Sequence, residues 1–190
     1  IDERRRAGEP PDEYVLRLAE AKARAAAALS RAVGPILAAD TVVVDGSELL
    51  GKPESVEDAR RMLQQLRGRV HQVYTAVVVY DPPNLRLVSD LCMTQVPMRN
   101  YTEQEIERYI ASRDPFDKAG AYGIQHKRFH PVENFQGCFA SVMGLPLCHF
   151  VRSMREFGHE PPKDVPFACQ ANLKYECPVF DAILRGEQAG

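Results

Sequence analysis

The sequence predicts an α/β fold with a mixed β-sheet. Helical and strand patterns alternate along the chain, and turn signals between some consecutive strands indicate hairpins within the sheet. The chain has 190 residues, of which 45% are hydrophobic and 26% are charged. This length and composition are sufficient for one globular domain with a buried core.

The first predicted element is a helix over residues 12–29, where apolar side chains recur about every 3.6 residues and lead into a run of alanines. Gly34-Pro35 ends it. Residues 36–44 include three valines, one isoleucine and one leucine and predict a buried strand. Asp45-Gly46 predicts a tight turn into a short return strand over residues 48–50.

Ser55 is a predicted N-cap for a helix that ends just before Gly68. Residues 70–80 predict a long strand, and residues 85–97 its antiparallel partner, because the Asp-Pro-Pro-Asn sequence between them favours a turn. These elements complete the predicted sheet apart from one short segment later in the chain.

Thr102 and Glu105 have the spacing of a capping box and predict a helix that begins there. Residues 114–125 are small and polar and predict a loop, residues 129–132 a short strand, and residues 145–157 a final helix. Beyond residue 157 the composition becomes proline-rich. We therefore expect a domain over residues 1–157 and a C-terminal extension over residues 158–190 that is partly ordered at best.

Charge and cysteine content narrow the classes of function. With 24 basic and 26 acidic residues, the net charge of −2 gives no footprint for nucleic acid, so no nucleic-acid partner is expected. No apolar run has the length of a membrane span, so no membrane association is expected. The five cysteines are an odd number, and Cys92, Cys138 and Cys148 lie in apolar contexts, which predicts reduced, buried thiols in a cytoplasmic protein.

Asp40 is the sharpest single signal, because a carboxylate within a hydrophobic strand is costly to bury unless it is paired or binds a metal. The alternative is an aspartate that caps a turn at the strand's end. Lys22 in the first helix and Lys52 in a Gly-Lys-Pro sequence would each be exposed lysines by default, and Glu3 a solvated charge.

Together these residues predict a phosphate-binding site. Two acids could hold a divalent cation, and two lysines could neutralise a triphosphate. A nearby polar loop could hydrogen-bond phosphate or base, the alternative being a polar loop without a ligand; its candidate residues are Asp117, Lys118, Tyr122 and Gln125.

Five segments, taken in order and spacing, resemble the Maf family of nucleotide pyrophosphatases over residues 1 to about 157. They are YVLRLAEAKA at 14–23, ADTVVV…GKP at 39–53, GRVHQVYTAV at 68–77, DKAGAYGIQ at 117–125 and GLPL at 144–147. The resemblance implies an elongated, twisted mixed sheet flanked by helices, with a cleft for a nucleoside triphosphate. It also implies hydrolysis of dTTP or UTP to the monophosphate and diphosphate with a divalent cation, magnesium or manganese.

The same resemblance implies roles for individual residues. Asp40 would be the proton acceptor, and Glu3 a metal-site or water-positioning acid that shares the cation with Asp40. Lys22 and Lys52 would bind phosphates. Thr41 and Gln125 match positions that separate the members acting on dTTP and UTP from those acting on methylated GTP, and Asp117 and Lys118 would complete the substrate-binding loop.

The chain also departs from the family pattern. Members begin with a strand and an S-x-S-P-R-R turn that binds phosphate, and this sequence starts after that turn. The competing hypothesis is therefore a catalytically impaired Maf-like nucleotide-binding or interaction module.

The extension carries a weaker hypothesis. Cys169 and Cys177, with Cys148, His149 and His159, could bind zinc, although their spacing matches no common zinc module. The alternative is an arm that packs on its own domain or on a second subunit of a homodimer.

Overall fold

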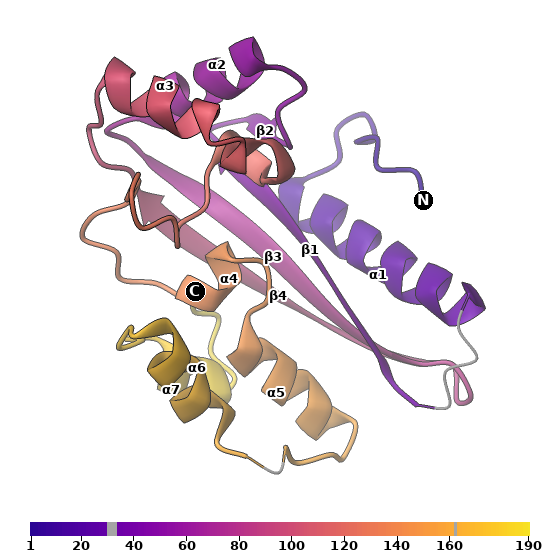
Figure 1. Ribbon diagram of the computed structural model, residues 1–190. Helices are drawn as coiled ribbons and strands as arrows, with labels where there is room; N and C mark the ends of the chain where they lie inside the picture. Colours follow the sequence, from indigo (N-terminus) through magenta and orange to yellow (C-terminus); the bar gives the residue numbers. More distant parts are fainter. Residues whose placement is uncertain (30–33, 162) are drawn as a thin grey trace.

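A computed structural model describes residues 1–29, 34–161 and 163–190 (Figure 1). Its centre is a four-stranded sheet in the order β2-β1-β3-β4. The strands are β1 (Ile36–Asp45), β2 (Glu48–Leu50), β3 (Val70–Asp81) and β4 (Arg86–Pro97). All three pairings are antiparallel, and the β1–β3 and β3–β4 ladders extend over most of the length of these strands.

Helices cover both faces of this sheet (Figure 1). They are α1 (Pro11–Leu29), α2 (Val56–Leu66), α3 (Glu103–Ala111), α4 (Phe139–Val142), α5 (Leu147–Glu156), α6 (Val165–Leu173) and α7 (Phe180–Leu184). α1 lies along one face, α4 and α5 lie on the other with α6 and α7 outside them, and α2 and α3 pack together near β2.

The alternation of side chains along β1 divides the core into two parts. Val42 and Val44 pack with α1, where Val15, Ala19 and Ala23 are buried. Val43 faces the opposite way and joins the core around α2 and α3. Because successive strand residues point to opposite faces, this register places Asp40 on the α1 face and Thr41 on the other.

Capping residues in the sequence correctly predicted where α2 and α3 begin. The hydroxyl of Ser55 accepts a hydrogen bond from the Asp58 N–H at 3.0 Å. Thr102 and Glu105 form the reciprocal capping box at the start of α3. Such caps satisfy N–H groups that have no partner within the helix, so they depend only on nearby residues.

The α/β class with a twisted, helix-flanked sheet is confirmed, but three details differ from the prediction. The described strands pair antiparallel throughout rather than as a mixed sheet. Residues 129–132 form only a single bridge, from Val132 to Met98, because His130 has a φ of 45° and Pro131 has no N–H to donate to a ladder. The predicted loop 114–125 contains two short 3₁₀ helices, Asp114–Asp117 and Ala119–Ala121.

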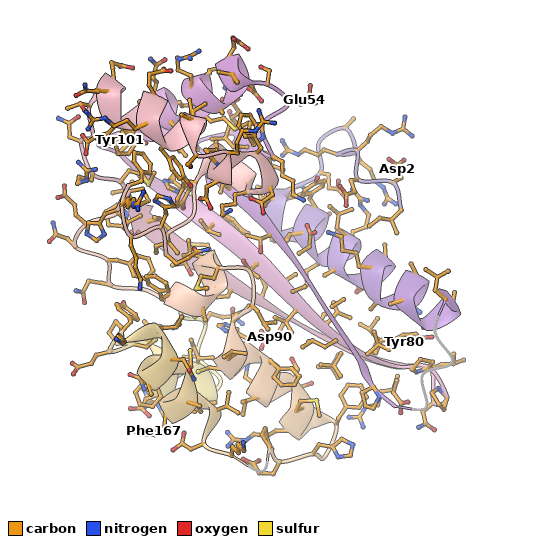
Figure 2. The ribbon with its side chains drawn as sticks, viewed as in Figure 1. Asp2, Glu54, Tyr80, Asp90, Tyr101 and Phe167 are labelled. Carbon is orange, nitrogen blue, oxygen red and sulfur yellow. The ribbon has the colours of Figure 1, made fainter. Side chains whose placement is uncertain are left out.

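The C-terminal extension is more ordered than predicted. Ile183 of α7 is fully buried, and Arg152 of α5 donates hydrogen bonds both to the Ile183 carbonyl at 3.2 Å and to Asp90 at 2.7 Å. Figure 2 shows Asp90 beside α5 and Phe167 on the outer side of α6. The arm therefore packs on its own domain, one of the two alternatives that the sequence left open.

The cysteines are free, and Cys92, Cys138 and Cys148 are buried as predicted. Within the described ranges no three His, Cys, Asp or Glu side chains are placed to hold a metal ion, so the residues suggested for zinc are not gathered into such a group. Across those ranges, no helix combines the length and apolar character that a membrane crossing requires.

Candidate active site

A cleft of about 800 Å³ opens along β1 and contains every residue predicted for the phosphate- and nucleotide-binding site. Its walls come from the segment before α1, from α1, β1, the turn after β2, the 117–125 loop and the end of α4. The predicted residues that line it are Glu3, Lys22, Asp40, Thr41, Lys52, Asp117, Lys118, Tyr122 and Gln125.

Asp40 and Thr41 line one cleft although they point to opposite faces of the sheet. Among the described strands, β2 pairs only with residues 43–45 of β1, so residues 36–42 have a neighbouring strand on the β3 side alone. The cleft surrounds this free edge, and both faces of β1 are accessible from it.

Lys22 lies between the two acids that the sequence singled out. Its ammonium group donates a hydrogen bond to Asp40 Oδ1 and lies 3.5 Å from Glu3 Oε1. The Asp40 side chain is only 10% exposed, whereas that of Glu3 is 62% exposed. The other carboxylate oxygen of Asp40, Oδ2, accepts no hydrogen bond from any described residue, which leaves one oxygen free for chemistry.

Burial sets the protonation behaviour of this pair. It raises the pKa of Asp40 above the usual aspartate value, although the hydrogen bond from Lys22 acts in the opposite direction. Burial lowers the pKa of Lys22, but the hydrogen bond and charge of Asp40, with the charge of Glu3, outweigh it, so that the pKa of Lys22 is raised overall. A carboxylate with a raised pKa is a better proton acceptor.

A clamp that the sequence analysis did not identify holds Glu3 in the cleft. Arg17 of α1 forms a salt bridge with Glu9 at 2.5 Å and donates to the Asp2 carbonyl at 3.3 Å. Tyr14 donates to the Glu3 carbonyl at 2.9 Å and also lines the cleft. The only sequence signal for the clamp was the helical spacing that places Tyr14 and Arg17 on neighbouring turns.

Lys52 lies on the turn after β2, and this turn is tied to the 117–125 loop. The Gly120 N–H donates to the Gly51 carbonyl at 3.0 Å. Gly120 has a φ of 69°, and a Cβ there would lie 3.0 Å from Val43 Cγ2. No described acid forms a salt bridge with Lys52, which lines the cleft and whose charge acts on Asp40 and Asp117.

The 117–125 loop is held by its own charges and by α3. Lys118 donates to Asp117 Oδ1 at 2.6 Å and to the Asp114 carbonyl at 2.9 Å. The hydroxyl of Tyr109 donates to Asp114 at 2.5 Å and accepts from the Gly123 N–H at 3.0 Å. Gln125 follows as an exposed side chain whose amide has no hydrogen-bond partner among the described residues.

The donor set of the cleft suits a hard divalent cation. Glu3 and Asp40 already converge on one cationic group, the Lys22 ammonium, and Mg²⁺ typically uses one or two carboxylates together with water and substrate phosphate oxygens. The lining also includes Glu54, which the sequence analysis did not select. With it the described residues that line the cleft supply four carboxylates and three ammonium groups, so their summed charge is net negative before any cation binds.

Comparisons with known proteins agree with this picture. The sequence model of the family described as Maf-like protein matches residues 1–157. A protein of Chromobacterium violaceum described as dTTP/UTP pyrophosphatase is 46% identical over 166 residues, which cover 85% of this chain and 83% of the relative. Relatives with the same description from Dehalococcoides mccartyi and Citrifermentans bemidjiense are 45% and 44% identical over 151 residues, 80% of this chain and 67% and 78% of theirs.

Proposed function

The chain belongs to the Maf family, and from that premise we propose that it hydrolyses dTTP and UTP to the nucleoside monophosphate and diphosphate. It is then a nucleoside triphosphate diphosphatase, a hydrolase that acts on an acid anhydride. The observation that carries this proposal is the meeting of a buried carboxylate, Asp40, with Lys22 and Lys52 in one cleft of nucleotide size.

In the proposed reaction Asp40 is the general base. A water oxygen forms a bond to the α-phosphorus, the bond from that phosphorus to the bridging oxygen breaks, and diphosphate leaves. The water proton goes to Asp40 Oδ2, the oxygen that no described donor occupies. The raised pKa of Asp40 brings its basicity closer to that required at neutral pH.

Lys22 and Lys52 bind the phosphates and offset charge that develops in the transition state. Lys22 would exchange its contact with Asp40 for one with phosphate. This exchange leaves Glu3 and Asp40 available to a cation.

Glu3 and Asp40 would hold that cation, magnesium or manganese, and when bound it would neutralise phosphate charge and acidify water. The net negative charge of the described lining residues supports a need for a cation. Without one, a triphosphate would meet more carboxylates than ammonium groups. Asp117, Lys118, Thr41 and Gln125 would contact the nucleoside end of the substrate.

The decisive experiment measures diphosphate release from UTP, dTTP, CTP, ATP and GTP with magnesium. Release from UTP and dTTP with kcat/KM at least tenfold above ATP and GTP supports the proposal. Tight binding of UTP without diphosphate release would instead support a Maf-like nucleotide-binding module.

We further propose that residues 1–157 form the Maf-like domain and residues 158–190 a C-terminal extension, a division that the span of the family match supports. The free thiols support action in the cytoplasm, where cysteines stay reduced. A homodimer and the absence of nucleic-acid binding stay predictions. Light scattering coupled to size-exclusion chromatography tests the first, and gel-shift titration with duplex and single-stranded DNA tests the second.

A further inference from the structure

A chain of hydrogen bonds connects the cleft to the interior of the protein through two threonines. Thr41 and Thr75 lie directly opposite each other on β1 and β3. Their hydroxyl oxygens are 2.9 Å apart, and the Thr75 hydroxyl oxygen is also 2.9 Å from the carbonyl oxygen of Ser141 in α4. Thr75 is fully buried, whereas Thr41 borders the cleft.

The proton positions in this chain of hydrogen bonds follow from its final acceptor, the backbone carbonyl of Ser141. A backbone carbonyl only accepts hydrogen bonds, so the single proton of the Thr75 hydroxyl points to Ser141. The Thr75 oxygen must then accept the proton of Thr41. The reverse arrangement would leave two oxygens 2.9 Å apart with no proton between them inside the protein, which is unfavourable.

The Ser141 carbonyl is itself held in place. It also accepts the Gly144 N–H at 2.8 Å, which closes the turn after α4. Gly144 has a φ of 106°, and a Cβ there would come within 3.5 Å of the Thr41 hydroxyl. The glycine therefore lets the turn pass close to Thr41, and the acceptor at the end of the chain has little freedom to move away.

From this geometry we propose that Thr75 is a positioning residue that makes the Thr41 hydroxyl a hydrogen-bond acceptor toward the base. Thr41 would then select bases that present an N–H donor, such as the imide N3–H of uracil and thymine. Cytosine presents an acceptor, its N3, at the same place and is rejected. This inference rests on the proposed function, and it assigns to Thr75 a part in base selection.

Gln125 cannot supply the same discrimination by itself. Its amide is exposed and has no partner among the described residues, so it can rotate to present either its oxygen or its NH₂ group. A side chain that can adapt to either base tolerates both. The Thr41 hydroxyl differs from this amide, because its hydrogen bond to the buried Thr75 fixes it as an acceptor toward the cleft.

The test compares UTP with CTP, which have nearly the same size. Two variants of Thr75 separate the hydroxyl from the volume: Thr75→Val removes the hydroxyl, and Thr75→Ser retains it. Binding of the non-hydrolysable α,β-imido analogues of UTP and CTP is measured by calorimetry, and kcat/KM is measured with the natural triphosphates.

We expect the wild type to prefer the uridine nucleotide in both assays. Thr75→Val should lower the UTP-to-CTP preference about tenfold, because the freed Thr41 hydroxyl can rotate and donate to cytosine. Thr75→Ser should restore most of it. If Thr75→Val does not fold, as judged by its melting curve, Thr75→Ala replaces it with the same expectation.

Three results would overturn the inference: a wild type without preference, an unchanged preference in the hydroxyl-free variant, or a serine variant as unselective as valine. The two assays keep this failure separate from failure of the proposed function. Absence of diphosphate release by the wild type refutes the enzyme, while the binding preference of the analogues still decides the role of Thr75.

Discussion

Asp40 combines a buried position, one oxygen that accepts from Lys22 and a second without a described partner. A second aspartate on the same strand, Asp45, has a similarly buried side chain, 7% exposed against 10% for Asp40, but it pairs with Arg69 and Gln65 and lies outside the cleft. A comparison of substitutions at the two aspartates therefore distinguishes the loss of any buried carboxylate from the loss of the carboxylate in the cleft.

Asp40→Asn keeps the shape of the side chain but cannot take a proton. We expect kcat with UTP to fall about 10²- to 10⁴-fold. Folding should be retained, because the amide relieves a buried charge and Lys22 keeps Glu3 as a partner. Asp45→Asn is the matched control and should keep kcat within a few-fold. Steady-state kinetics and melting curves decide the point, and a folded Asp40→Asn enzyme with near-normal turnover would make Asp40 a structural residue.

Lys52 forms no salt bridge with the described acids, so its charge is available to the substrate. Lys52→Ala should raise KM for UTP and also lower kcat, because phosphate charge is present in the ground state and grows in the transition state. Lys163→Ala, which removes an exposed lysine outside the cleft, is the control. A kinetic profile for Lys52→Ala that matches this control would exclude Lys52 from phosphate binding.

At the scale of elements, the site depends on loops that are fixed by contacts to the sheet. The turn with Lys52 and the loop with Asp117 are joined at Gly51 and Gly120, and Gly120 packs against Val43 of β1. The position of these charges is thus tied to the same strand that holds Asp40.

Gly120→Ala tests this connection, with Gly46→Ala as its control. Both glycines have a positive φ, 69° and 62°, so each substitution should cost about 1 kcal/mol of stability. Only at position 120 would the new Cβ also press on a neighbour, at 3.0 Å from Val43. We expect both variants to melt a few degrees lower and only Gly120→Ala to lose kcat/KM. Equal activity in the two would show that the loop connection is dispensable.

At the scale of the whole molecule, a buried histidine links stability to pH. His71 of β3 is 2% exposed and contacts the Tyr122 hydroxyl at 2.8 Å, next to the cleft. Burial lowers the pKa of His71 to about 4. The folded protein therefore holds this histidine neutral at a pH where the unfolded chain would already bind a proton.

The sign of the pH effect follows from this difference. Above the unfolded pKa of about 6.5 both states are neutral and stability is unaffected by His71. As the pH falls from there to about 4, the unfolded state gains the proton, and stability should decrease by about 3 kcal/mol. Urea unfolding at a series of pH values should show this loss in the wild type and a smaller one in His71→Gln. Identical pH dependence in both proteins would rule out His71 as the cause.

The sequence alone was sufficient for α1, α2, α3 and α5, for β1 to β4 and for the chemistry of the candidate residues, but it did not predict α4, α6 or α7. Strand propensity, helical periodicity and the caps at Ser55 and Thr102 act over a few residues, so they can be recognised without the fold. Asp40 was selected as a carboxylate within a hydrophobic strand, and the resemblance to the Maf family added roles for Lys22 and Lys52; all three line the cleft.

Tertiary structure decided what depends on residues far apart in the chain. Only the packing of α1 on β1 brings Lys22 to Asp40, and only the β1–β3 register places Thr75 beside Thr41 and Ser141. Three further features also depend on distant residues. They are the antiparallel pairing, the failure of residues 129–132 to form a strand and the packing of the C-terminal helices. The physical reason is common to all of them: a hydrogen bond or a packed contact between distant residues depends on three-dimensional geometry, which short-range sequence patterns do not encode.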